Sequence, residues 1–304
     1  MTAPDLHRVL IANDGREGLA PALDKAARIE RITGAAILVV ETFYDPIADE
    51  PLEVLRRDER ERLIERIRRS EQEALEAVVE PFRDRVARVG ARLIWTRDGA
   101  AAIVDTATEW RAQLLIKPVS PHHPVADFFQ TPLDWALMRE APCPVLVSKG
   151  SSWNPPGRVL AAVDAADTGH AALNREILRR AHLLASLIDA ELHVATAYPD
   201  LGQTPGQLQV ADDFAGLKAD MRESRERILL ALMRALEIEP AELHLLEGRP
   251  ARVIPPLAQR LQATLTVLGT AARRGVAKLV IGNTAENLIG RLEGDLVTVR
   301  EPWS

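Results

Sequence analysis

The residues with the clearest capacity for chemistry lie in one loop of the second half of the chain. An apolar run ends at Gly269, and the loop that follows carries Arg273, Arg274 and Lys278, with no acidic residue before Glu286. Glycine lets a backbone approach a ligand closely, and free N–H groups at a helix start favour an anion when positive charge is near. The loop therefore predicts a phosphate-binding site, although the same residues also fit an ordinary turn that caps the next helix.

Seven residues of this loop, and one aspartate from an earlier apolar run, form the predicted nucleotide-binding set. The loop residues are Gly269, Thr270, Ala272, Arg273, Gly282, Asn283 and Thr284. Asn283 and Glu286 have the spacing of a capping box, so a helix is predicted to start there. Asp164 ends its apolar run, where a carboxylate can hold ribose hydroxyls or an adenine amino group. A turn-forming or helix-capping role for Asp164 fits equally well.

The first half of the chain provides an internal comparison for this loop. A shift of 151 residues aligns Pro118 with Gly269 and Pro132 with Asn283. Proline has no N–H to donate to a phosphate. The same loop of the first half also contains Asp127 and no lysine or arginine. We therefore expect a phosphate-bearing ligand in the second half alone.

Both loops belong to a repeat of about 150 residues. Arg8–Asp14 recurs as Arg158–Asp164, and in both copies a short apolar run ends in aspartate. The predicted strands are residues 8–14, 35–43, 91–96, 114–117 and 144–148, then 158–164, 190–197, 243–247, 265–268 and 295–300. The predicted helices are residues 20–33, 52–89, 101–111 and 133–139, then 171–188, 213–236, 251–261 and 285–291. Pro255 and Pro256 fall inside one of these helices, where proline removes a helical N–H donor.

The alternation of strands and helices predicts an α/β fold, with βαβ crossovers and a parallel sheet covered on both faces. The strands are nearly continuous runs of Val, Ile, Leu and Ala, as expected when both faces of a sheet are buried. We predict two tandem doubly wound domains, residues 1–149 and 158–304, joined by a turn-rich linker at 150–157. In such sheets, ligands bind at the carboxyl ends of the strands, where the strand order reverses.

Composition argues against several other classes of protein. The formal net charge is −6, and the many arginines are interleaved with glutamates, which is unlike a nucleic-acid-binding surface. No apolar stretch approaches the roughly 20 residues of a membrane helix, and no signal-peptide pattern is visible. The single cysteine, Cys143, is predicted to be a buried thiol at the start of a strand. We expect a cytoplasmic protein that binds neither nucleic acid nor membrane.

No metal site and no catalytic residue is predicted. His122 and His123 form the only adjacent histidine pair, and adjacent histidines in a proline-rich loop usually point apart; the other histidines are scattered. The sequence contains neither a Ser-Gly-Gly-x-Asp-Ser pyrophosphate loop nor a Gly-x4-Gly-Lys-Ser/Thr loop. It also offers no assignable carboxylate pair or Ser/His/Asp set. An enzyme is therefore not the first expectation.

Together these motifs resemble the universal stress protein family over nearly the whole chain, and most of all its bacterial E-type tandem members. The second half carries Glu247-Gly248-Arg249-Pro250-Ala251, Val267-Leu268-Gly269-Thr270 and Gly282-Asn283-Thr284-Ala285-Glu286. The first half carries Phe129-x-Thr131-Pro132-x-Asp134-Trp135 and Pro142-x-Pro144-Val145. The resemblance implies two five-stranded parallel sheets of order 3-2-1-4-5, of the adenine-nucleotide alpha-hydrolase-like kind. It also implies domains paired through their last strands, and a homodimer.

The resemblance implies ATP, ADP or AMP as the ligand, with Mg²⁺ only as the companion of the nucleotide. Nucleotide-binding members use Gly, two residues, Gly, nine residues, and then Gly followed by Ser or Thr. Here Ala272 and Asn283 replace the second glycine and the hydroxyl residue. The first hypothesis is a regulatory stress-response protein that senses a nucleotide through its second domain. The alternatives are an ATP-hydrolysing or adenylylating enzyme of the same architecture, and a sensor or carrier of a small apolar metabolite at the aromatic first-domain loop (Phe128, Phe129 and Trp135).

Overall fold

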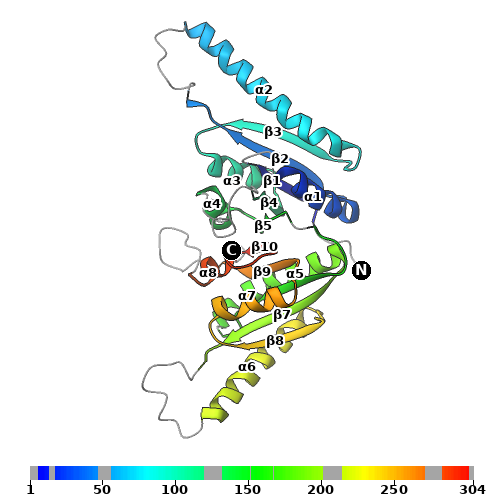
Figure 1. The fold of residues 1–304 in the computed structure, drawn as a ribbon, viewed down its shortest axis with the longest axis vertical. Helices are drawn as coiled ribbons and strands as arrows, with labels where there is room; N and C mark the ends of the chain where they lie inside the picture. Colours follow the sequence, from blue (N-terminus) through cyan, green and yellow to red (C-terminus); the bar gives the residue numbers. More distant parts are fainter. Residues whose placement is uncertain are drawn as a thin grey trace. The chain divides into compact units, whose positions relative to one another are not determined.

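The computed structural model describes residues 6–13, 18–46, 56–119, 132–150, 152–166, 168–200, 214–270 and 283–300. These residues divide into two compact units, one on each side of residue 151, and each unit contains a parallel sheet (Figure 1). Each unit is a doubly wound α/β domain, as predicted from the repeat. Within the described ranges, none of the helices combines the length and the apolar composition needed to cross a membrane.

The first domain alternates strands and helices along the chain. Its elements are β1 (Arg8–Asn13), α1 (Leu19–Thr33), β2 (Ala36–Phe43), α2 (Arg57–Arg83), β3 (Val89–Trp95), α3 (Gly99–Glu109), β4 (Leu114–Pro118), α4 (Pro132–Glu140) and β5 (Val145–Ser148). The strand order is β3-β2-β1-β4-β5, and every pairing is parallel.

The second domain repeats this order. Its elements are β6 (Gly157–Ala162), the short 3-10 helix η4 (Thr168–His170), α5 (Ala171–Ile188), β7 (Ala190–Tyr198), α6 (Phe214–Ala235), β8 (Glu242–Glu247), α7 (Pro250–Arg260), β9 (Leu265–Gly269), α8 (Asn283–Ile289) and β10 (Asp295–Val299). The strand order is β8-β7-β6-β9-β10, again all parallel. The order 3-2-1-4-5 implied by the family resemblance is therefore confirmed in both domains.

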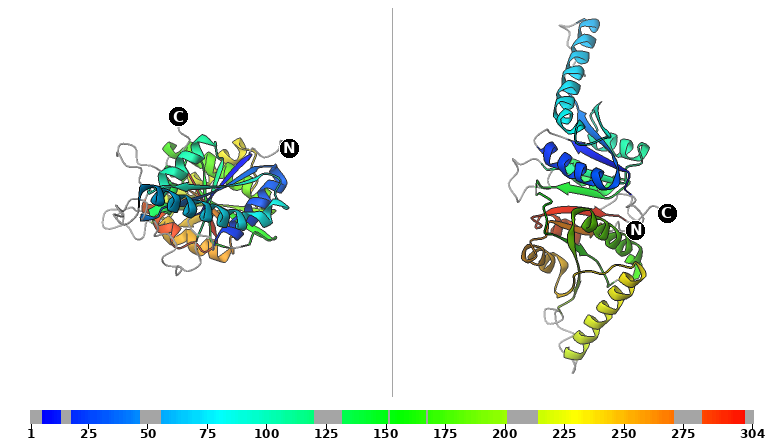
Figure 2. Two further views of the ribbon diagram at one scale, coloured as in Figure 1. Left: turned by 90° about the horizontal axis from the view of Figure 1, so that it is seen from above. Right: turned by 90° about the vertical axis from the view of Figure 1, so that its right-hand side faces the viewer.

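Helices cover both faces of each sheet. In the first domain α1 contacts α2 and α3 contacts α4, and in the second domain α7 contacts α8. The right-hand view of Figure 2 shows α5, in green, and α7, in orange, on opposite sides of the second sheet. The central strands are consequently buried on both faces: Leu10, Ile11 and Leu160 have no exposed surface. Each such side chain contributes about 1.5–3 kcal/mol of burial free energy.

Most helices differ from their predicted bounds by one or two residues, and the long first-domain helix differs by more. The long first-domain helix ends at Arg83 rather than at residue 89, because Val86 is buried in the core and the chain then enters β3. Conversely, α7 begins at Pro250 and continues through both of its internal prolines, Pro255 and Pro256. Pro250 is tolerated because the first turn of a helix has no internal N–H partner to lose.

The first strand of each domain ends before the aspartate that was predicted to close it. β1 ends at Asn13 and β6 at Ala162. Asp14 lies outside the described residues, and Asp164 follows β6 in a turn. Cys143 is half-buried rather than buried, which corrects the expectation for that thiol.

The predicted linker contributes a residue to the second domain. Trp153 is buried, and its Nε1–H donates a hydrogen bond of 2.7 Å to Oδ2 of Asp295. Asp295 is the fully buried first residue of β10. A buried indole N–H needs such an acceptor, so the chain is already anchored to the second domain before β6 begins.

Candidate nucleotide site in the second domain

The strand order of the second sheet reverses at β6, which has β7 on one side and β9 on the other. Ala162, the last residue of β6, pairs with Leu268 of β9. Gly269 follows Leu268 directly, and Asp164 and Thr270 follow this pair by two residues each. The structure therefore brings three of the predicted site residues to the carboxyl ends of two paired strands, which is the edge at which such sheets bind ligands.

Asp164 is held in a turn by its backbone and by one carboxylate oxygen. The side chain of Asn174 accepts a hydrogen bond from the Asp164 N–H (3.1 Å) and donates one to its carbonyl (2.6 Å). Oδ1 of Asp164 accepts from the Ala166 N–H at 2.9 Å, which closes an Asx turn. Oδ2 lies 3.3 Å from Nδ1 of His170, and 54% of the Asp164 side chain is exposed. Asp164 therefore has the turn-forming role, and its carboxylate is also partly exposed beyond the carboxyl end of β6.

Gly269 lies close to side chains of α5, where this helix packs on β9. A Cβ atom at this position would lie 2.7 Å from Cδ2 of Leu173 and 3.0 Å from Cδ1 of Ile177. The side chains of α5 thus occupy the space that a larger residue at position 269 would need. The structure gives this glycine a packing role, whereas the sequence had suggested only a close approach of the backbone to a ligand.

Replacement of Gly269 by alanine is expected to lower the free energy of unfolding by about 1–2 kcal/mol, because the added methyl group overpacks against Leu173. Chemical denaturation followed by circular dichroism measures the change. The double variant Gly269→Ala/Leu173→Val is expected to be more stable than the sum of the two single changes predicts, since the shorter side chain makes room. A Gly269→Ala variant as stable as the parent would contradict this packing role.

Thr270 is turned toward β10. Its N–H donates to the carbonyl of Val299 at 2.8 Å, and its hydroxyl lies 3.4 Å from the same oxygen. Of the remaining predicted residues, Ala272, Arg273 and Gly282 lie outside the described residues, and Asn283 and Thr284 are described only as the backbone of the first turn of α8. His122, His123, Phe128 and Phe129 of the first domain also lie outside the described residues.

The first domain carries a buried ion pair at the corresponding position. Strand register aligns β4 with β9, so Lys117 corresponds to Leu268, and the same shift aligns Asp134 with Ala285. Nζ of Lys117 lies 3.2 Å from Oδ1 of Asp134, and the two side chains are 2% and 4% exposed. Nζ of Lys117 also donates to the carbonyl of Pro118 at 2.7 Å. Where the second domain has two buried apolar side chains, the first has opposite charges.

Three polar residues around Asp164 were not singled out from the sequence: His170, Asn174 and Thr196. Oγ1 of Thr196, a fully buried residue of β7, accepts from the Ala165 N–H at 3.4 Å. A signal for Asn174 was present, because it falls on the apolar stripe of α5 and is only 4% exposed. A polar side chain at a buried helical position requires hydrogen-bond partners, and here the partners belong to the turn that holds Asp164.

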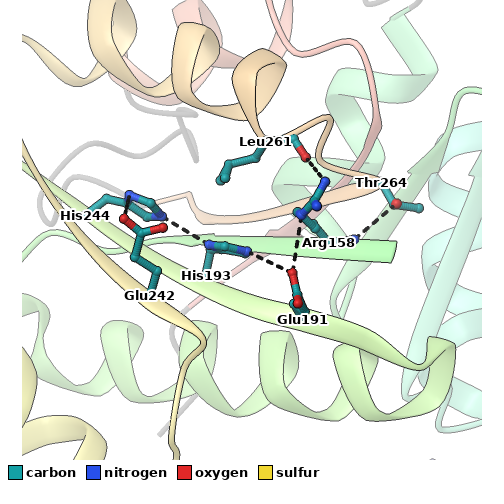
Figure 3. A network of polar contacts seen from close by, with 7 residues as sticks. All are labelled: Arg158, Glu191, His193, Glu242, His244, Leu261 and Thr264. Carbon is teal, nitrogen blue, oxygen red and sulfur yellow. Dashed lines mark hydrogen bonds and ion pairs between the residues drawn. The ribbon is translucent and has the colours of Figure 1, made fainter. Parts of the chain in front are cut away.

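A second polar group was also missed, on the adjacent strands β7 and β8 (Figure 3). Strand register pairs His193 with Glu242 and Ala195 with His244, which places both histidines on one face of the sheet. The residues are 5% and 7% exposed, and their rings stack with centroids 5.4 Å apart. The sequence analysis treated these histidines as scattered, because they are separated by 51 positions and only strand pairing joins them.

Comparison with known proteins gives matches over both halves of the chain. A family model described as the universal stress protein family matches residues 6–149 and again residues 156–300. Universal stress protein E of Escherichia coli (strain K12) is 27% identical over 298 residues, which are 96% of this chain and 93% of that protein. The universal stress protein E homolog of Haemophilus influenzae is 25% identical over 297 residues, 95% of this chain and 94% of the homolog. The crystal structure of a functionally unknown Pseudomonas aeruginosa PAO1 protein matches with a TM-score of 0.74 at 27% identity, covering 98% of this chain and 94% of that one.

Proposed function

Because the chain belongs to the universal stress protein family and contains two copies of its domain, we propose that it is a regulatory stress-response protein that binds an adenine nucleotide through its second domain. The observation that carries the proposal is the pairing of β6 with β9 where the strand order reverses, because Asp164 follows the carboxyl end of β6 and Gly269 ends β9. ATP, ADP and AMP are the candidate ligands, with Mg²⁺ accompanying the phosphates.

The residues at these strand ends have groups that could bind the parts of a nucleotide. Oδ2 of Asp164 is not used by the Asx turn and accepts hydrogen bonds from ribose hydroxyls or an adenine amino group. The loop that follows Thr270 supplies the positive charge of Arg273, Arg274 and Lys278 to the phosphates. Ala272 adds a methyl group where nucleotide-binding members have glycine, so we expect weak binding.

Titration calorimetry of the full-length chain with ATP, ADP and AMP tests the proposal. Asp164→Asn is the informative variant, because its amide oxygen still accepts from the Ala166 N–H and the turn is retained. We expect Asp164→Asn and Arg273→Ala each to weaken nucleotide binding about tenfold, equivalent to about 1.4 kcal/mol. Asp14→Asn, the same change at the same position of the first repeat, is the matched control and should bind as the parent does.

The outcomes separate the proposal from its alternatives. Nucleotide binding that is unchanged in Asp164→Asn and Arg273→Ala would remove the second-domain site. Release of inorganic phosphate from bound ATP at a steady rate would favour the ATP-hydrolysing enzyme. An apolar metabolite found by mass spectrometry of the purified protein, in place of a nucleotide, would favour the carrier.

A further inference from the structure

The buried histidine pair of β7 and β8 has the composition and spacing of a metal site. One potential ligand atom from each of His193, Glu242 and His244 lies within 4.8 Å of the other two. The facing nitrogens, Nδ1 of His193 and Nε2 of His244, are 3.1 Å apart, and two nitrogens bound to one tetrahedral zinc ion are about 3.4 Å apart. We propose that these three residues bind a divalent transition-metal ion such as Zn²⁺, leaving a coordination position for water.

Each of the two histidines has a glutamate nearby (Figure 3). Nε2 of His193, the nitrogen that does not face His244, lies 3.7 Å from Oε2 of Glu191, and a carboxylate in this position orients a metal-binding histidine and raises its basicity. Oε1 of Glu242, the proposed third ligand, lies 3.6 Å from Nδ1 of His244. Nε2 of His193 is buried and has no hydrogen-bond partner among the described residues. Nε of Arg158 lies 3.3 Å from Oε2 of Glu191 and fixes that carboxylate in turn.

The surroundings of the pair suit a cation that enters from solvent. Glu191 and Glu242 are 59% and 62% exposed, so acidic side chains lead from the surface to the buried rings and offset the charge of an ion.

The three proposed metal ligands are present in the second domain and have no counterparts in the first. In the first domain, the positions of His193, Glu242 and His244 are occupied in register by Leu38, Gly90 and Arg92. Within the second domain, the three residues lie toward the amino ends of β7 and β8, whereas Asp164 lies past the carboxyl end of β6. Metal binding is therefore independent of the nucleotide proposal, and its test succeeds or fails separately.

Zn²⁺ binding by the metal-depleted full-length chain tests the proposal. Competition with a chromophoric chelator is expected to show one ion per chain in this site. His193→Gln, His244→Gln and Glu242→Gln remove proposed ligands, so each should weaken binding by more than the roughly 100-fold that loss of an outer-shell partner causes. His182→Gln is the matched control, because His182 is exposed on α5 and should leave the affinity unchanged.

Two further measurements distinguish a loss of metal binding from a loss of folding. Glu242 is exposed, so Glu242→Gln is expected to retain the circular dichroism spectrum of the parent while losing affinity. Co²⁺ bound to the parent should give the strong visible absorption of a tetrahedral site, and this band should disappear in His244→Gln. Failure to bind Zn²⁺ at micromolar concentrations, or binding of equal strength in the parent and His193→Gln, would overturn the proposal.

Discussion

Replacement of Lys117 by leucine is expected to destabilise the first domain by about 3–5 kcal/mol. The change removes the ammonium group that lies 3.2 Å from Oδ1 of Asp134, in a pair whose members are 2% and 4% exposed. The remaining carboxylate keeps its desolvation cost and loses the attraction that offset it. Hydrogen exchange of the full-length chain measures the effect, because amides of β1, β4 and β5 should exchange faster while the second-domain strands serve as an internal reference.

The double variant Lys117→Leu/Asp134→Ala separates the loss of charge compensation from any other effect of the substitution. It copies the apolar pair Leu268 and Ala285 that occupies the same positions of the second domain. We expect it to recover stability to within about 1 kcal/mol of the parent, since buried ion pairs are often replaceable by well-packed apolar residues. A double variant as unstable as Lys117→Leu alone would show that loss of the attraction between Lys117 and the Asp134 carboxylate is not the cause.

Replacement of Asn174 by alanine is expected to cost the second domain about 2–3 kcal/mol, because the Asp164 N–H and carbonyl both lose their side-chain partner. We also expect nucleotide binding to weaken about tenfold, since the turn that aims the Asp164 carboxylate is loosened. Denaturation and calorimetry measure the two effects. In the Asn174→Ala background, Asp164→Asn should have little further effect on affinity, which is the signature of a positioning residue.

Asn174→Asp is the matched control for this prediction. It keeps an acceptor for the Asp164 N–H but sets a second oxygen against the Asp164 carbonyl, where the native amide donates at 2.6 Å. At neutral pH we expect it to be at least as destabilised as Asn174→Ala. An aspartate tolerated as well as the native asparagine would contradict the role assigned to this donor.

Much of the fold was predictable because its signals are local. The apolar runs are strands, buried in the middle of each sheet, and the recurrence of Arg8–Asp14 as Arg158–Asp164 identified the two domains. The strand order came from the family resemblance, since periodicity alone does not say which strands pair. Element ends were less predictable: Val86 continues a helical pattern in sequence, but tertiary packing buries it beyond the end of α2.

The candidate site was predictable only in part, for the same reason. The sequence identified Asp164 and Gly269 as residues at strand ends, and parallel pairing of β6 and β9 brings those ends together. The packing of Gly269 against Leu173 depends on how α5 lies over the sheet. Likewise, His193 and His244 become neighbours only through the register of β7 and β8. Contacts between residues distant in sequence leave no spacing signal to read.

Photoaffinity labelling of the full-length chain with 8-azido-ATP, followed by peptide mapping, asks most directly which domain holds the nucleotide. We predict labelled peptides within residues 158–304, with labelling suppressed by an excess of unlabelled ATP and reduced in Asp164→Asn. Specific labelling confined to residues 1–149 would contradict the assignment of the nucleotide to the second domain.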